Sequence, residues 1–144
     1  MNPGERRILL VEDNPLNQEV MRETLARLGY ALGVANDGRE ALERLATVEY
    51  PLVFMDCQMP VTDGYEATSK IRLHENGSRH TLIVAMTAHA MKGDRKKCLR
   101  AGMDDYLAKP IKKEDLLEIL EKWIPERRAN EPERTGEEFR VGKG

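Results

Sequence analysis

Short apolar runs alternate with longer segments of helical period along most of this chain. The runs have the length of strands, and they cover residues 6–12, 31–35, 52–56, 82–87 and 106–108. The third run is apolar from Leu52 to Met55, which is typical of a strand buried on both faces of a parallel sheet. The second run is interrupted by Gly33 and is the weakest. Strands that alternate with helices predict an α/β fold of five β-α units.

Helix-start and helix-stop residues bracket the segments between these runs. Asn14 can cap the first helix, Pro15 can occupy its first turn, and Gly29 ends it. Asp37 and Glu40 have the spacing of a capping box at the start of the second helix. The helices are expected at about residues 15–28, 37–48, 64–75, 92–101 and 113–123. The pattern therefore places one helix after each strand.

A change in composition near Pro125 marks the end of the folded part. We expect one domain at residues 6–124, preceded by an N-terminal extension at residues 1–5. From residue 126 to residue 144 the only apolar side chains are Ala129, Phe139 and Val141, amid mixed charges. Such a segment cannot bury enough apolar surface to fold alone. Residues 125–144 are therefore expected to form a charged flexible tail or linker.

The charge and the cysteines narrow the class of protein. A net charge of -2 with 33% charged residues gives no reason to expect nucleic-acid binding or direct membrane contact. Cys57 and Cys98 fit neither a disulfide framework nor a metal motif, and no signal peptide or long apolar stretch is present, so we expect a cytoplasmic protein. For Cys57 a redox switch stays an alternative to the preferred interpretation, a small half-buried residue beside a strand end.

Polar residues with related chemistry end several of the predicted strands. Glu12 and Asp13 close the first strand and Asp56 closes the third, so their carboxylates are expected together at the carboxyl edge of the sheet. Like charges packed so closely indicate a divalent cation, since a hard cation with oxygen ligands removes their repulsion. Thr87 and Lys109 end two further strands and add a hydroxyl and an ammonium group. Together these groups predict a phosphoryl site.

The residues around these strand ends carry a family resemblance. The motifs are Val11-Glu12-Asp13-Asn14, Met55-Asp56-Cys57-Gln58-Met59-Pro60, Asp63-Gly64, Met86-Thr87-Ala88 and the segment from Gly102 to Pro110. In this order the chain resembles a response-regulator receiver domain, the phosphoacceptor half of two-component signalling, over residues 6–124. The resemblance implies a flavodoxin-like, doubly wound five-stranded parallel sheet of order 2-1-3-4-5 with five helices.

The resemblance also implies the roles of the residues in the site. Asp56 would be the phosphoacceptor, with Lys109 and Thr87 stabilising charge on the transferring group. Mg²⁺, with Mn²⁺ as an alternative ion, would be held by Asp13 and Asp56, by Glu12 through water, and by the backbone carbonyl of Gln58. These ligands suffice because Mg²⁺ usually keeps several waters.

A switch and residues that tune the site are implied in the same way. The family couples inward movement at the Thr87 position to rotation at the Tyr106 position. Ala88 is small enough to leave access for phosphate, and Pro110 is expected to follow a cis peptide bond. For His89 two interpretations stay open, since it either tunes the lifetime of the phosphoryl group or merely lines the loop.

The residues of these motifs resemble those of receivers of hybrid sensor histidine kinases more than those of transcription-factor receivers. This resemblance implies a histidine kinase domain as phosphodonor, a histidine phosphotransfer domain as onward acceptor, and no enzyme activity beyond the domain's own phosphoryl transfer and dephosphorylation. One alternative is a Mg²⁺-dependent phosphohydrolase with an aspartate nucleophile, which needs an acid where Gln58 stands. The other alternative is a pseudo-receiver that binds partners without phosphate, against which the intact set of site residues argues.

Overall fold

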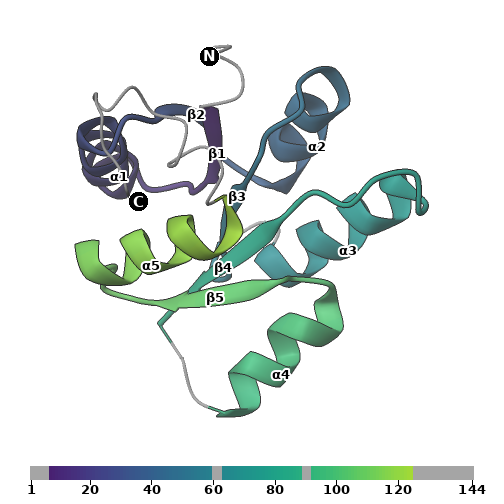
Figure 1. Ribbon diagram of the computed structural model, residues 1–144. Helices are drawn as coiled ribbons and strands as arrows, with labels where there is room; N and C mark the ends of the chain where they lie inside the picture. The colour runs from purple at the N-terminus through teal and green to yellow at the C-terminus, as the bar shows by residue number, and fades with distance from the viewer. Residues whose placement is uncertain (1–6, 60–62, 89–91, 125–144) are drawn as a thin grey trace, which may run out of the picture.

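The computed structural model describes residues 7–59, 63–88 and 92–124 of the chain (Figure 1). Within these residues a five-stranded parallel sheet has the order β2-β1-β3-β4-β5, which confirms the predicted α/β fold and its strand order. The strands are β1 Arg7–Val11, β2 Ala31–Ala35, β3 Val53–Asp56, β4 Ile83–Thr87 and β5 Asp105–Ala108. The helices are α1 Pro15–Arg27, α2 Gly38–Thr47, α3 Gly64–Glu75, α4 Lys92–Ala101 and α5 Lys113–Trp123.

The helix starts follow the expected capping chemistry. The side chain of Asn14 accepts hydrogen bonds from the backbone N–H groups of Leu16 and Asn17, at 2.9 and 3.1 Å. Asp37 caps α2 in the same way, with Oδ1 2.9 Å from the backbone nitrogen of Glu40. These caps satisfy backbone donors that have no partner inside the helix, and each contributes about 1 kcal/mol. They fix where each helix leaves the carboxyl edge of the sheet.

Two apolar layers form the core, one on each face of the sheet. Along β1, Ile8 and Leu10 point to one face and Leu9 and Val11 to the other, and all four are fully buried. Buried residues of α1 and α5 belong to the first layer, whereas those of α2, α3 and α4 belong to the second. Figure 1 shows the same division, with α1 and α5 on one side of the sheet. The near-continuous apolar strands are explained by burial on both faces.

The strand register brings the polar strand ends to one edge. Val11 pairs with Met55, Asp56 pairs with Met86, and Thr87 pairs with Ala108. The residues at these pairs or directly after them therefore lie next to one another across four neighbouring strands. This is the carboxyl edge, where open α/β sheets bind ligands.

Some boundaries differ from the expectation. Leu52 and Leu82 precede β3 and β4 rather than opening them, although their carbonyl groups accept hydrogen bonds from Leu9 and Val53 of the neighbouring strands. β5 begins at Asp105, one residue earlier than predicted. The expected extension and tail lie outside the described residues. No helix in the described part of the chain is both long and apolar enough to cross a membrane.

Candidate functional site

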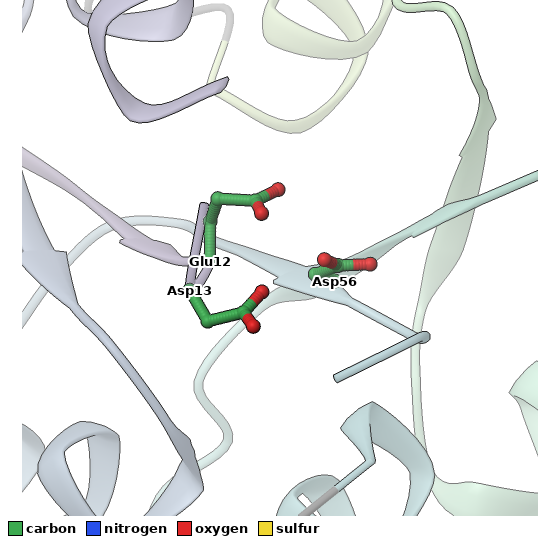
Figure 2. A group of neighbouring side chains, drawn as sticks. All are labelled: Glu12, Asp13 and Asp56. Carbon is green, nitrogen blue, oxygen red and sulfur yellow. The ribbon is translucent and has the colours of Figure 1, made fainter. Parts of the chain in front are cut away.

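Carboxylates from the ends of β1 and β3 converge at the carboxyl edge of the sheet. Figure 2 shows the carboxylates of Glu12 and Asp13 extending toward Asp56, and one oxygen of each of the three lies within 4.8 Å of the others. Glu12 and Asp56 are buried, whereas Asp13 is exposed. Hard carboxylate oxygens at the surface end of a sheet, with one side open to water, suit an ion such as Mg²⁺ that keeps part of its hydration shell. The arrangement therefore fits the predicted metal site.

Neighbouring groups of α1 hold Glu12 in place. Its Oε2 accepts hydrogen bonds from the backbone N–H of Asn14 at 3.0 Å and from the side chain of Asn17 at 3.4 Å. Gln18 donates to the carbonyl oxygen of Glu12 at 2.6 Å. Burial raises the pKa of Glu12, and the nearby charge of Asp56 raises it further. A cation in this cluster would offset both effects.

Two donors contact the carboxylate of Asp56. The ammonium Nζ of Lys109 lies 2.7 Å from Oδ1, and the backbone N–H of Gln58 donates to the same oxygen at 3.0 Å. Asp56 is only 2% exposed, whereas the side chain of Lys109 is 26% exposed. A buried carboxylate needs such a partner, because an unpaired charge in this position would be strongly destabilising. The ion pair joins the third and fifth strands across the site.

Lys109 is oriented by the turn that follows β5. The Lys109-Pro110 peptide bond is cis, as predicted. The backbone N–H of Lys109 donates to the carbonyl of Thr87 at 2.8 Å, so this turn stays attached to β4. From this turn the ammonium group of Lys109 reaches the carboxylate of Asp56.

The Gln58 side chain makes contacts that the sequence did not reveal. Its Nε2 donates to Oγ1 of Thr87 at 3.4 Å, and its Oε1 accepts from the backbone N–H of Ala88 at 3.3 Å. Thr87 is fully buried at the end of β4, and Ala88 is exposed just beyond it. One amide thus links the loop after β3 to the loop after β4. Sequence spacing alone gives no signal for this contact, since it depends on the loop conformation.

Tyr106 lies on β5, beside the strand that ends in Thr87. It pairs in register with Ala85 and is half-buried against the core layer of α2, α3 and α4. Its coupling to Thr87 stays a prediction. His89 lies outside the described residues, and so do both of the interpretations considered for it.

Gly64 packs directly on the backbone of the candidate phosphoacceptor. A Cβ atom added at Gly64 would lie 2.4 Å from the carbonyl oxygen of Asp56 and 3.0 Å from the Cα of Cys57. The Gly64 N–H donates to the carbonyl of Cys57 at 3.3 Å. The first turn of α3 therefore supports the end of β3. The Asp63-Gly64 motif was visible in the sequence, but this contact was not.

Cys57 fits the structural interpretation better than the redox one. It is 2% exposed, and burial raises the pKa of its thiol to about 12. A thiol with so small a thiolate fraction is a poor nucleophile toward oxidants. Tyr65 and Cys98 are its polar neighbours, and they lie in α3 and α4.

Relatives of this chain carry the same domain. The hybrid signal transduction histidine kinase G of Dictyostelium discoideum is 45% identical over 123 residues, which are 84% of this chain and 4% of that protein. The receiver domain of a sensor histidine kinase of Pseudomonas aeruginosa PAO1, solved with a magnesium ion in its active site cleft, is 49% identical with a TM-score of 0.75 and covers 84% of this chain and 98% of its own.

A third similar structure is the co-crystal of the Saccharomyces cerevisiae histidine phosphotransfer protein Ypd1 with the receiver domain of its downstream response regulator Ssk1. The match is 32% identical with a TM-score of 0.77 and covers 85% of this chain and 91% of that one. The chain spans between 4% and 15% of the lengths of the curated relatives considered. The sequence model of the response regulator receiver domain matches residues 8–121, and the chain belongs to this family of two-component signalling domains.

Proposed function

We propose that this chain accepts a phosphoryl group on Asp56 from a phosphohistidine donor and then changes the shape of its output surface. The observation that carries the proposal is the buried Asp56 carboxylate, which lies 2.7 Å from the Lys109 ammonium and within 4.8 Å of the oxygens of Glu12 and Asp13. A nucleophilic carboxylate, a phosphate-binding cation and a metal site are the groups that phosphoryl transfer to an acid needs.

Mg²⁺ is the ion that we assign to the acidic cluster. Asp13 and Asp56 would hold it directly, Glu12 through water, and the backbone carbonyl of Gln58 would add a further ligand. When bound, it would neutralise charge on the carboxylates and on the phosphoryl oxygens. The magnesium ion in the Pseudomonas aeruginosa receiver supports this assignment.

Asp56, Lys109 and Thr87 have separate roles in the phosphoryl transfer. A carboxylate oxygen of Asp56 forms the new P–O bond, while the P–N bond of the donor breaks and its electron pair stays on the imidazole nitrogen. Lys109 is within reach of Asp56 and stabilises charge on the phosphoryl oxygens as it grows. Thr87 then binds one of these oxygens, and its movement gives Tyr106 room to rotate inward.

The exposed face of α1 is our candidate surface for the phosphodonor. Leu16 and Val20 are one helical turn apart and are 71% and 56% exposed. Val20 also lines a cavity of about 420 Å³, together with Glu12, Lys109 and Pro110. An apolar patch beside the phosphoacceptor suits a helical donor that must place its histidine over Asp56. The co-crystal of Ypd1 with a receiver supports a histidine phosphotransfer domain, the proposed onward acceptor, as a second partner for the same surface.

The wider setting follows from the relatives. Because these relatives include hybrid histidine kinases, we propose a kinase domain as phosphodonor, a phosphotransfer domain as onward acceptor, and a cytoplasmic site of action. The surface formed by α4, β5 and α5 would pass the signal on, without binding nucleic acid or the membrane. The domain would catalyse only its own phosphorylation and dephosphorylation.

Phosphorylation by a small donor tests the proposal directly. With acetyl phosphate and Mg²⁺, intact-mass spectrometry should show the addition of one phosphoryl group, which EDTA and Asp56→Asn should each abolish. Unchanged labelling of Asp56→Asn would refute the assignment of the phosphoacceptor. No labelling, together with no Mg²⁺ binding, would favour the pseudo-receiver. Steady release of phosphate from a generic ester would favour the phosphohydrolase.

A further inference from the structure

The side chain of Gln58 connects two groups that stand next to the phosphoacceptor. Its amide donates to Oγ1 of Thr87 at 3.4 Å and accepts from the N–H of Ala88 at 3.3 Å, a pair of contacts that we call the Gln58 bridge. The backbone N–H of Gln58 meanwhile donates to Oδ1 of Asp56 at 3.0 Å. The same residue therefore contacts the phosphoacceptor and the end of β4 at once.

These contacts compete with the contacts of a phosphoryl group. Phosphoryl oxygens only accept hydrogen bonds, so on Asp56 they require donors at the same edge of the sheet. The N–H of Ala88 is such a donor, and in this structure it is already bonded to Oε1 of Gln58. The amide of Gln58 also lies against the hydroxyl of Thr87. A phosphoryl oxygen that accepts from the N–H of Ala88 must displace Oε1 of Gln58. The hydroxyl of Thr87 can accept from Gln58 and still donate, so there the Gln58 bridge opposes the inward movement of Thr87 rather than the new hydrogen bond itself.

The bridge is weak enough to be displaced. Both of its hydrogen bonds are long, and Gln58 and Ala88 are exposed, so water can replace the contact between them. Charge-assisted hydrogen bonds to a phosphoryl group are roughly twice as strong as neutral ones. Exchanging hydrogen bonds to Gln58 for hydrogen bonds to a phosphoryl group therefore favours the phosphorylated arrangement. The free energy gained is smaller than it would be without the Gln58 bridge.

We infer that Gln58 is a positioning residue that holds Thr87 and Ala88 in the resting arrangement and so sets the threshold for the switch. This inference rests on the proposed function, since it assumes that a phosphoryl group on Asp56 uses these donors. A variant without the bridge should bind a phosphoryl analogue more tightly and should populate the active arrangement more in the resting state.

The test compares the unmodified chain with Gln58→Met and Gln58→Ala. Methionine keeps the length of the side chain and removes both hydrogen bonds, so it separates the bridge from simple steric obstruction. In calorimetric titrations with beryllofluoride and Mg²⁺, both variants should bind roughly fivefold more tightly, the change expected when about 1 kcal/mol of competing hydrogen bonds is lost. Unchanged or weaker binding by Gln58→Met would overturn the inference.

Two further measurements keep this inference separate from the proposed function. Without beryllofluoride, the amide shifts of Thr87 and Ala88 should already move in Gln58→Met toward their positions in the beryllofluoride complex, and identical resting shifts would contradict the Gln58 bridge. In a Thr87→Val background the effect of Gln58→Met should shrink, whereas additive effects would exclude the coupling. Failure of the unmodified chain to bind beryllofluoride would instead overturn the proposed function and, with it, the competition.

Discussion

Gly64 shows how tightly the backbone of Asp56, the proposed phosphoacceptor, is supported. Because an added Cβ atom would lie 2.4 Å from the carbonyl oxygen of Asp56, Gly64→Ala must displace the end of β3 or the start of α3. We expect a loss of about 1–3 kcal/mol in the free energy of unfolding, as for other overpacked positions. The affinity for beryllofluoride, measured by calorimetry, should weaken at least tenfold. Urea unfolding of the same variant measures the loss of stability.

Gly77→Ala is the matched control for this change. Gly77 has a φ of +78°, but nothing lies within 4 Å of an added Cβ atom there. The substitution should therefore destabilise the fold by about 1 kcal/mol through backbone strain and leave beryllofluoride affinity unchanged. If Gly64→Ala lowered affinity no more than Gly77→Ala does, the support of Asp56 by α3 would be unimportant.

At the residue scale, the sequence identified groups that stand at the ends of apolar runs. Asp56, Thr87 and Lys109 could be placed in this way because each follows a run of strand length, and strand ends share an edge. The Gln58 bridge and the Gly64 contact could not be predicted, because both depend on the path of the loop between β3 and α3. A residue's spacing from a strand does not determine which way a loop side chain turns.

At the element scale, the proposed switch depends on one hydroxyl at the end of β4, that of Thr87. Thr87→Ala should still accept a phosphoryl group on Asp56, since Lys109 and the acidic cluster remain. It should lose most of the shift changes around Tyr106 and α4 on addition of beryllofluoride, because no hydroxyl draws the loop inward. Amide chemical shifts with and without beryllofluoride measure this.

Thr68→Ala is the control for that experiment. Thr68 is a fully buried threonine of α3, and its hydroxyl has no hydrogen-bond partner among the described residues. Its substitution should leave the shift changes on the output surface intact. If Thr87→Ala gave the same response as the unmodified chain and Thr68→Ala, the coupling between Thr87 and Tyr106 would be refuted.

Asp105 ties the start of β5 to the end of α5. Its Oδ2 accepts hydrogen bonds from the indole of Trp123 at 2.9 Å and from Lys122 at 3.1 Å, and its Oδ1 accepts from the N–H of Tyr106 at 2.8 Å. Burial alone would raise the pKa of Asp105, but these hydrogen bonds outweigh it and lower the pKa below its ordinary value. These hydrogen bonds join the backbone of Tyr106 to the last turn of α5.

The lowered pKa of Asp105 fixes the sign of a pH dependence. A carboxylate with a lower pKa in the folded chain stabilises it fully above the unfolded value of about 3.9, and this stabilisation is lost as the pH falls through the folded value. Asp105→Asn should therefore lower the free energy of unfolding at neutral pH by on the order of 1 kcal/mol and flatten its decline in acid. Urea unfolding monitored by Trp123 fluorescence measures both, with the exposed Glu118→Gln as control. An equal decline in acid for Asp105→Asn and the unmodified chain would exclude this role.

The order of elements was predictable because each strand-length run is followed by a segment of helical period, and the first two of these segments open with helix-capping residues. Asn14 and Asp37 act as caps where the sequence placed them. The strand starts at β3 and β4 were placed one residue early, because Leu52 and Leu82 are apolar and contribute only their carbonyl groups to the sheet. Apolar pattern alone does not distinguish a strand residue from one that leads into it.

At the scale of the whole molecule, ion pairs lie at both ends of the sheet, but among the described residues three carboxylates gather within 4.8 Å at the carboxyl edge. Near the start of β5, Arg72 forms ion pairs with Glu75 at 2.9 Å and with Asp104 at 3.1 Å. At the carboxyl edge, Lys109 is the ammonium that faces the acidic cluster, so negative charge is in excess there. The parallel direction of the strands separates these two ends. The order of the strands in the sheet came from the family resemblance, since periodicity predicts the elements but not their neighbours.

This excess charge predicts a conflict between folding and metal binding. Asp13→Asn removes one of the repelling carboxylates, and Asp13 is exposed, so in EDTA the free energy of unfolding should rise by about 1 kcal/mol or less. Added Mg²⁺ should stabilise the unmodified chain by about 2.7 kcal/mol at a concentration one hundred times its dissociation constant, and should leave Asp13→Asn almost unchanged. Urea unfolding in EDTA and in Mg²⁺ measures both effects. Glu23 is an exposed acid of α1 outside the cluster, so the control variant Glu23→Gln should behave like the unmodified chain. If Asp13→Asn were destabilising in EDTA, Asp13 would be a structural residue rather than one held at a cost in stability. If Mg²⁺ stabilised Asp13→Asn as strongly as the unmodified chain, Asp13 would not be a metal ligand.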